Sequence, residues 1–201
     1  MPPDILLALA IFALVMAGTP GPNNMMVMAS GLNFGFRRTI PHMLGIAIGF
    51  GLMCAMVGLG LGQVFARFPM IYTVLRIVGT AYLLWLALAI ARSGPVEEGE
   101  VRGAPLSFLQ GALFQWVNPK AWVIAVGAVS AYGQPENFAL SVSMIGLVMA
   151  VVTVPCVAVW TGFGTALRAI LSDVRQVVWF NRIMALLLVA SLWPIIADFF
   201  R

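Results

Sequence analysis

The sequence predicts an all-α integral membrane protein with six transmembrane helices, arranged as two inverted three-helix repeats with a proline-broken first helix in each repeat. Three observations support this prediction. The 201-residue chain is 62% hydrophobic and only 9% charged, whereas a soluble protein carries about 25% charged residues. Six apolar runs are each long enough to cross a hydrocarbon core of about 30 Å as a helix. Prolines interrupt the first run of each set of three.

The apolar runs follow one another with short polar loops between them. The first follows a leader, Met1-Pro2-Pro3-Asp4, without Lys or Arg, so we expect a retained helix rather than a signal peptide. The longest loop, 93–105, is a linker that separates the repeats 1–92 and 106–201. The predicted spans are residues 5–29, 40–64, 69–91, 106–132, 138–162 and 177–199.

Arginine positions predict the orientation of the chain in a bacterial inner membrane. Seven arginines fall in the first, third and fifth loops and only two on the opposite side. Because basic loops stay in the cytoplasm, we expect these loops and the linker inside the cell and both termini outside. The net charge of +4 therefore indicates no nucleic-acid partner. The two groups are Arg37, Arg38, Arg92, Arg102, Arg168, Arg175 and Arg182, and Arg67 and Arg201.

Each proline break is expected to expose backbone groups to a substrate. A proline displaces the carbonyl group four residues back, which frees the carbonyl oxygens of Met16, Gly18 and Gln115. The helices that resume after Pro22 and Pro119 should begin with unpaired amides at a positive dipole end, and such an end suits a carboxylate. Unwound backbone at membrane depth is tolerated where it lines a cavity. The breaks lie at similar distances before the next span, as in transporters with inverted repeats.

Polar side chains around the breaks complete the candidate substrate site. Lys120, the single lysine, lies near the middle of its span, where a charge costs at least ~2.5–3.5 kcal/mol and indicates function. Snorkelling toward the cytoplasmic interface is the alternative for this residue. Amides, including Gln110, bind both the carboxylate and the ammonium group of a zwitterion. The candidate substrate-binding residues are Thr19, Pro20, Gly21, Pro22, Asn23, Asn24, Gln115, Asn118, Pro119 and Lys120.

No acidic residue falls inside a predicted span, because all seven lie in loops or at span ends. A cationic substrate side chain would thus find no carboxylate, and we expect a neutral or apolar amino acid as the substrate. Proton coupling would then use His42, Lys120, a carboxylate at a span end, or the substrate itself. His42 follows the Arg37-Arg38 loop and is otherwise an interfacial residue. Arg76 is either functional or snorkels.

The motifs together resemble the LysE/RhtB family of amino-acid exporters. The resemblance is carried by Thr19-Pro20-Gly21-Pro22-Asn23, by Gly45 to Gly49, and by Phe108-Leu109-Gln110-Gly111 leading into Asn118-Pro119-Lys120-Ala121. Chain length and number of spans extend it over essentially the whole chain. It implies efflux of amino acids or close derivatives, driven by the proton gradient. The lack of acidic residues within the spans departs from what an exporter of basic amino acids would need.

Other classes of membrane protein remain as alternatives, including an exporter of another small solute. A thiol carrier would use Cys54 and Cys156, one in each half, but we expect both to be buried packing residues. A metal-ion exporter or a metalloenzyme needs facing ligands that the sequence does not provide, so we expect neither a metal nor a cofactor, and no enzyme. Small residues four apart favour close helix packing and leave a homodimer open. They are Gly45, Gly49, Gly58 and Gly62.

Replacing both cysteines with serine separates the exporter from the thiol carrier. We expect the Cys54→Ser/Cys156→Ser variant to export amino acids at the rate of the parent chain, because neither thiol takes part in export. Amino-acid release from dipeptide-loaded cells measures this rate. Loss of release at an unchanged amount of protein in the membrane would favour the thiol carrier.

Overall fold

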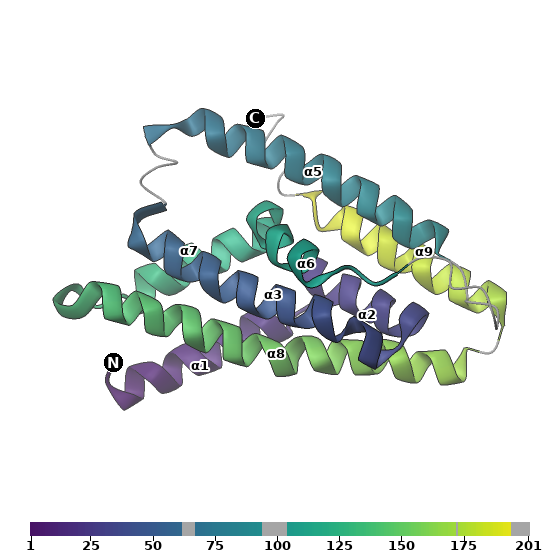
Figure 1. The fold of residues 1–201 in the computed structure, drawn as a ribbon, viewed down its shortest axis with the longest axis horizontal. Coiled ribbons are helices and arrows are strands. Elements are labelled where there is room, and N and C mark those ends of the chain that lie inside the picture. The colour runs from purple at the N-terminus through teal and green to yellow at the C-terminus, as the bar shows by residue number, and fades with distance from the viewer. Residues whose placement is uncertain (62–66, 94–103, 172, 194–201) are drawn as a thin grey trace.

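The regular secondary structure is helical in all the residues that the computed structural model describes, which are 1–61, 67–93, 104–171 and 173–193 (Figure 1). Helix occupies part of each of the six predicted runs, as expected. Residues 62–64 and 194–199 of two runs, and 94–103 of the linker, lie outside the described residues. The elements are α1 (Pro3–Gly18), α2 (Pro22–Phe34), α3 (Phe36–Met56), η1 (Val57–Leu61), α5 (Pro69–Arg92), α6 (Phe108–Phe114), η2 (Gln115–Val117), α7 (Pro119–Tyr132), η3 (Pro135–Asn137), α8 (Phe138–Ile170) and α9 (Val174–Ala190).

Two continuous helices within these ranges are long and apolar enough to cross a membrane, Phe36–Leu61 and Pro135–Arg168. The pair α1 and α2 forms a third candidate span, bent by 58° at the first break. The second break is also present, because α6 is followed by the 3₁₀ turn η2 and then by α7. The predicted all-helical fold is confirmed, and a helix break is present at each proline motif. The six spans and the inverted repeats remain predictions, since two or three spans meet the length and hydropathy criteria within the described residues.

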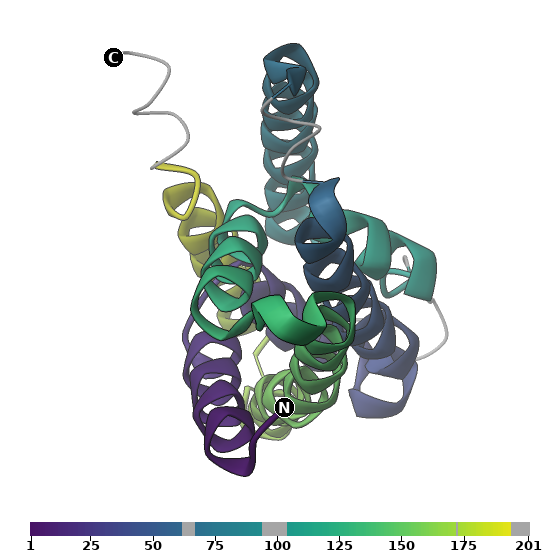
Figure 2. The same ribbon diagram turned by 90° about the vertical axis from the view of Figure 1, so that its left-hand side faces the viewer.

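Helices α3 and α8 pack along each other, and the broken segments lie on them (Figure 1, Figure 2). The halves α1 and α2 of the first broken segment pack on α8, whereas α6 and α7 of the second pack on α3. Helices α5 and α9 pair with each other. Each broken segment therefore packs on the long helix from the other half of the chain, which brings the two breaks together.

Glycines allow this close packing. A Cβ atom on Gly51 of α3 would lie 2.5 Å from the carbonyl oxygen of Gly146 on α8, and one on Gly146 would lie 2.6 Å from that of Gly51. Cβ atoms on Gly45 and Gly49 would overlap the backbone of α6. Gly45 and Gly49 thus serve packing within the chain. Gly62 lies outside the described residues.

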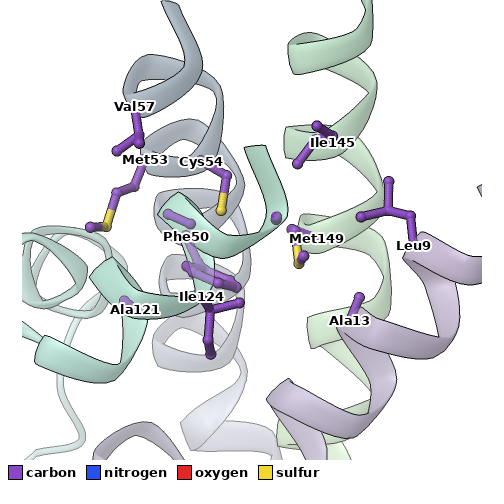
Figure 3. Packing of buried hydrophobic residues seen from close by; sticks show 12 residues of the cluster. Leu9, Ala13, Phe50, Met53, Cys54, Val57, Ala121, Ile124, Ile145 and Met149 are labelled. Atoms are coloured by element: carbon purple, nitrogen blue, oxygen red, sulfur yellow. The ribbon is translucent and has the colours of Figure 1, made fainter. Parts of the chain in front are cut away.

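A cluster of buried apolar side chains fills the space between α1, α3, α7 and α8 (Figure 3). Cys54 of α3 belongs to this cluster, and both Cys54 and Cys156 are buried free thiols. The prediction that they are buried packing residues is confirmed. The other cluster members labelled in the figure are Leu9, Ala13, Phe50, Met53, Val57, Ala121, Ile124, Ile145 and Met149.

Two glycines of α8 provide a matched test of the helix packing. A Cβ atom on Gly164 would overlap the carbonyl oxygen of Met28 on α2, whereas one on Gly162 would meet nothing within 4 Å. We expect Gly164→Ala to lower the free energy of unfolding by about 1–3 kcal/mol through overpacking. Gly162→Ala should be neutral or stabilising by up to about 1 kcal/mol, because alanine favours helix. Unfolding of both purified variants in detergent gives the comparison, and equal effects would contradict the packing.

Candidate functional site

The first break consists of three residues between α1 and α2, two of which are extended. Helix α1 ends at Gly18, Thr19 is extended, and Gly21 has φ −179° and ψ 178°. Pro22 then occupies the first position of α2, where its missing N–H would be unpaired in any case. A Cβ atom on Gly21 would lie 2.8 Å from Cδ of Lys120, so the absence of a side chain lets this lysine approach the break.

Side chains satisfy the carbonyl groups that the first break leaves unpaired. Nε1 of Trp160 on α8 donates to the carbonyl oxygen of Gly18 at 3.0 Å. The hydroxyl of Thr19 donates to the carbonyl oxygen of Met16 at 3.0 Å, and Nδ2 of Asn24 donates to the carbonyl oxygen of Thr19 at 2.8 Å. Because an unpaired carbonyl in hydrocarbon costs several kcal/mol, these bonds stabilise the unwound segment.

Lys120 connects the second break to the first. Its Nζ donates to the carbonyl oxygen and the hydroxyl oxygen of Thr19, each at 2.8 Å, and to the carbonyl oxygen of Pro20 at 3.3 Å. These three oxygens match the three donors of an ammonium group. The partly buried side chain therefore reaches across to the other break, and its charge is solvated by neutral oxygens.

The second break is closed by its own amide side chains. Oδ1 of Asn118 accepts a hydrogen bond from the backbone N–H of Lys120 at 3.1 Å and so caps α7. The carbonyl oxygen of Gln115 accepts from the N–H of Asn118 at 3.3 Å. The expectation of an unpaired amide beside Lys120 is thus wrong, because a side-chain cap occupies it. Helix α2 differs, since it begins after Gly21 with no side-chain cap.

A reciprocal pair of amides joins the two breaks a second time. Nδ2 of Asn23 donates to Oε1 of Gln115 at 2.9 Å, and Nε2 of Gln115 donates to Oδ1 of Asn23 at 3.0 Å. Gln115 is fully buried and also donates to the carbonyl oxygen of Gly111 at 2.9 Å. Two residues far apart in the sequence thereby fix the register of the two broken segments.

A small cavity lies where the breaks meet, with a volume of about 30 Å³. This is about the volume of one water molecule in the liquid, so the cavity in this conformation is too small for a larger ligand. The polar lining comes from Asn23, Asn24, Asn118, Lys120 and Thr153. The other lining residues are Met16, Ala17, Gly21, Phe50, Ala121, Ile124 and Val157.

Thr153 of α8 is a residue of this cavity that the sequence did not indicate. Its hydroxyl is buried, and it has no hydrogen-bond partner among the described residues. A threonine hydroxyl in a helix commonly bonds the carbonyl four residues back, as Thr161 does with Val157 at 2.7 Å. The hydroxyl of Thr153 is therefore available to a ligand. A single threonine within an apolar run carries no pattern that would reveal this.

Two other polar residues discussed above do not line this cavity, Gln110 and His42. Gln110 caps its own helix, because its Oε1 accepts from the backbone N–H of Ser107 at 2.8 Å, so grouping it with the amides of the breaks was wrong. His42 is buried in α3 and lines a different cavity. The side chain of Arg76 lies outside the described part of the structure.

Comparison with known families decides the class of the protein. Residues 14–192 match the LysE type translocator family, and this range includes both breaks. The chain belongs to the LysE type translocator family. It is therefore a membrane transport protein and not an enzyme, as predicted.

Curated relatives of this translocator carry names that specify a transported solute. The cysteine/O-acetylserine efflux proteins of Escherichia coli K12, Escherichia coli O139:H28 and Shigella sonnei are each 35% identical over 144 residues, covering 70% of this chain and 72% of the relative. No solved structure matches the chain. The comparisons thus bear on the family and on the class of solute, and the fold description rests on the computed structure.

The amide pair predicts a coupling between Asn23 and Gln115. Each single change to alanine should lower the free energy of unfolding by about 1–3 kcal/mol, because it leaves a buried amide unpaired. The double variant should lose about 0.5–3 kcal/mol less free energy of unfolding than the sum of the losses in the two single variants. Gln115→Ala combined with Ser143→Ala, an exposed position on α8, should be additive. Unfolding of the purified single and double variants in detergent measures each free-energy change. If the changes for Asn23 and Gln115 were additive, the contact between the two amides would be contradicted.

Proposed function

We propose that this translocator exports small amino acids with uncharged side chains, by proton-coupled secondary transport, through a site between its two breaks. The cavity at the junction of the breaks is the observation that carries the proposal. The relatives named cysteine/O-acetylserine efflux proteins support the substrate class, because both named solutes are small zwitterions without a charged side chain. Uncharged side chains also agree with a cavity whose described lining contains no carboxylate.

The substrate carboxylate binds at the start of α2 and at Lys120. The amides at positions Asn23 and Asn24 stand at the positive end of α2, which has no side-chain cap. Nζ of Lys120 exchanges the oxygens of Thr19 and Pro20 for the carboxylate. A bond between two charged groups is stronger than one to a neutral carbonyl, so this exchange favours the bound state and releases one connection between the breaks.

The remaining polar groups of the cavity orient the rest of the substrate. Oδ1 of Asn118 accepts one hydrogen bond, from the backbone N–H of Lys120, and retains a second lone pair for the ammonium group. The unpaired hydroxyl of Thr153 offers a partner for a thiol, hydroxyl or ester side chain. Apolar neighbours such as Phe50 and Ile124 exclude water around that side chain.

Movement of one inverted three-helix repeat against the other provides alternating access. The repeats are 1–92 and 106–201, joined by the cytoplasmic linker 93–105, with six spans in total. The reciprocal packing supports this division, since each broken segment lies on the long helix of the other half and α5 pairs with α9. Repeats related by a pseudo-twofold axis pack in this way.

The orientation in the bacterial inner membrane follows the arginines, with both termini outside the cytoplasm. Their exposed side chains at the helix ends agree with this placement. Arg182 is also exposed, but it lies in the middle of α9 and not in a loop, so its predicted place in the fifth loop was wrong. The exposed arginines of the cytoplasmic group are Arg37, Arg38, Arg92, Arg168, Arg175 and Arg182. Lys120 inside the site and His42 on the cytoplasmic side are the groups proposed for proton coupling.

A homodimer remains a prediction, and Gly45 and Gly49 no longer support it because they face α6.

The thiol carrier is the second candidate function. Cys54 and Cys156 are both buried as free thiols, and neither lines the cavity between the breaks. Their positions favour export over electron transfer.

Replacing Lys120 tests the proposed site. We expect Lys120→Ala to reduce amino-acid release from dipeptide-loaded cells by about tenfold or more, because it removes a charge-assisted bond to the substrate carboxylate. The amount of protein in the membrane should be unchanged. Ser130→Ala, an exposed position on the same helix, should export normally. Full export by Lys120→Ala would remove this residue from the mechanism, and no export of any amino acid by the parent chain would overturn the proposed function.

A further inference from the structure

A second, larger cavity lies between α2, α3 and α5 and extends to residues 104–106, just before α6. Its volume is about 290 Å³, which is close to the range of small-molecule sites. The polar residues along its wall are Ser30, Asn33, His42 and Ser93. It lies near the end of α2 and the start of α3, on the side of the predicted cytoplasmic loops.

The hydroxyl of Ser30 is an acceptor in this cavity. The hydroxyl of Thr39 donates to the carbonyl oxygen of Gly35 at 2.9 Å. The proton in the 2.9 Å bond between the hydroxyls of Ser30 and Thr39 therefore comes from Ser30. A hydroxyl that has used its one proton retains only acceptor capacity.

Asn33 is an acceptor in this cavity for a similar reason. Both N–H groups of its Nδ2 donate hydrogen bonds, to the carbonyl oxygen of Ala29 at 2.7 Å and to Oδ1 of Asn181 at 3.0 Å. Its Oδ1 accepts one hydrogen bond from Asn181 at 3.0 Å, and an amide oxygen accepts two. The hydroxyl of Ser93 likewise donates to the carbonyl oxygen of Ala89 at 2.9 Å and is left to accept.

His42 is the fourth and most informative polar residue on the wall. Its side chain is 1% exposed, and neither ring nitrogen has a hydrogen-bond partner within the described residues. A buried polar atom without a partner costs about 1–3 kcal/mol, so such an atom points to a missing ligand. One nitrogen of a neutral imidazole is an acceptor. The wall thus gathers acceptors from two helices around a space of sufficient size.

A cation lies next to one residue of the cavity wall. Phe34 lines the cavity, and the guanidinium carbon of Arg38 lies 5.8 Å from the centroid of its ring. A cation therefore stands beside the aromatic wall, on the first turn of α3. An amino acid entering with its ammonium group toward the acceptors would leave its carboxylate toward this cation.

We propose that the cavity is a second amino-acid site, which takes up the substrate from the cytoplasm by its ammonium group. Ser30, Asn33 and His42 accept hydrogen bonds from the ammonium group, and Arg38 attracts the carboxylate. The site between the breaks has the opposite preference, since its amides and Lys120 select the carboxylate. The proposal rests on the proposed function for the identity of the solute.

The test is equilibrium binding of radiolabelled L-cysteine, kept reduced, to the full chain in lipid nanodiscs. The parent chain should bind two equivalents and Lys120→Ala one. The binding that remains in Lys120→Ala should be displaced by cysteine methyl ester, which keeps the ammonium group, and not by N-acetylcysteine, which has lost it. Adding Ser30→Ala to this variant should weaken the remaining binding by about tenfold.

A pair of variants on α5 tests the cavity without changing Lys120. Ala89 lines the cavity and is exposed on α5, so Ala89→Leu fills the space at little cost to folding. Ala89→Leu should reduce the bound cysteine from two equivalents per chain to one. Ala81→Leu, at an exposed position outside the cavity lining, should leave two equivalents bound. The second site alone would be overturned if the parent chain bound a single equivalent of cysteine, and if Lys120→Ala abolished this binding while Ala89→Leu left it intact. Absence of both binding and export in the parent chain would overturn the proposed function as well.

Discussion

The structure depends on pairing the backbone groups that two proline breaks leave open inside an apolar helix bundle. Lipid supplies no hydrogen-bond partners, so each freed carbonyl must find a donor within the protein. At the first break the donors come from α8, from α2 and from α7, through Trp160, Asn24 and Lys120. The breaks must therefore lie close to one another and to α8, and the glycines of the central helices permit that distance.

The same pairing explains how the proposed site works. Lys120 is held by neutral oxygens, which satisfy its donors, and its charge has no carboxylate partner among the described residues. A substrate carboxylate is a better partner than a carbonyl, so binding replaces bonds that connect the halves of the chain. The reciprocal amides of Asn23 and Gln115 remain and keep the segments in register. In this proposal the bound state has a weaker connection between the proposed repeats, as alternating access requires.

Much of this arrangement was predictable, because prolines and a lone lysine within apolar runs leave strong local signals. The helical runs, both breaks and the position of Lys120 beside the second break follow from those signals. The capping of α7 by Asn118 was not predicted, since the choice between a free and a capped amide depends on one side-chain torsion. Thr153 and Trp160 were missed because an isolated residue on α8 acquires its role only from the fold. Gln110 was misplaced because its partner is local.

Lys120 is the single lysine of the chain, which permits a direct measurement of the central claim. Protein labelled with ¹⁵N at the lysine side chain should give one ammonium resonance in detergent or nanodiscs. Reduced L-cysteine and N-acetylcysteine should shift this resonance to saturation, because both carry a carboxylate, whereas cysteine methyl ester should not. An unchanged resonance under conditions in which the protein binds and exports the amino acid would contradict the account, since the carboxylate would then bind elsewhere.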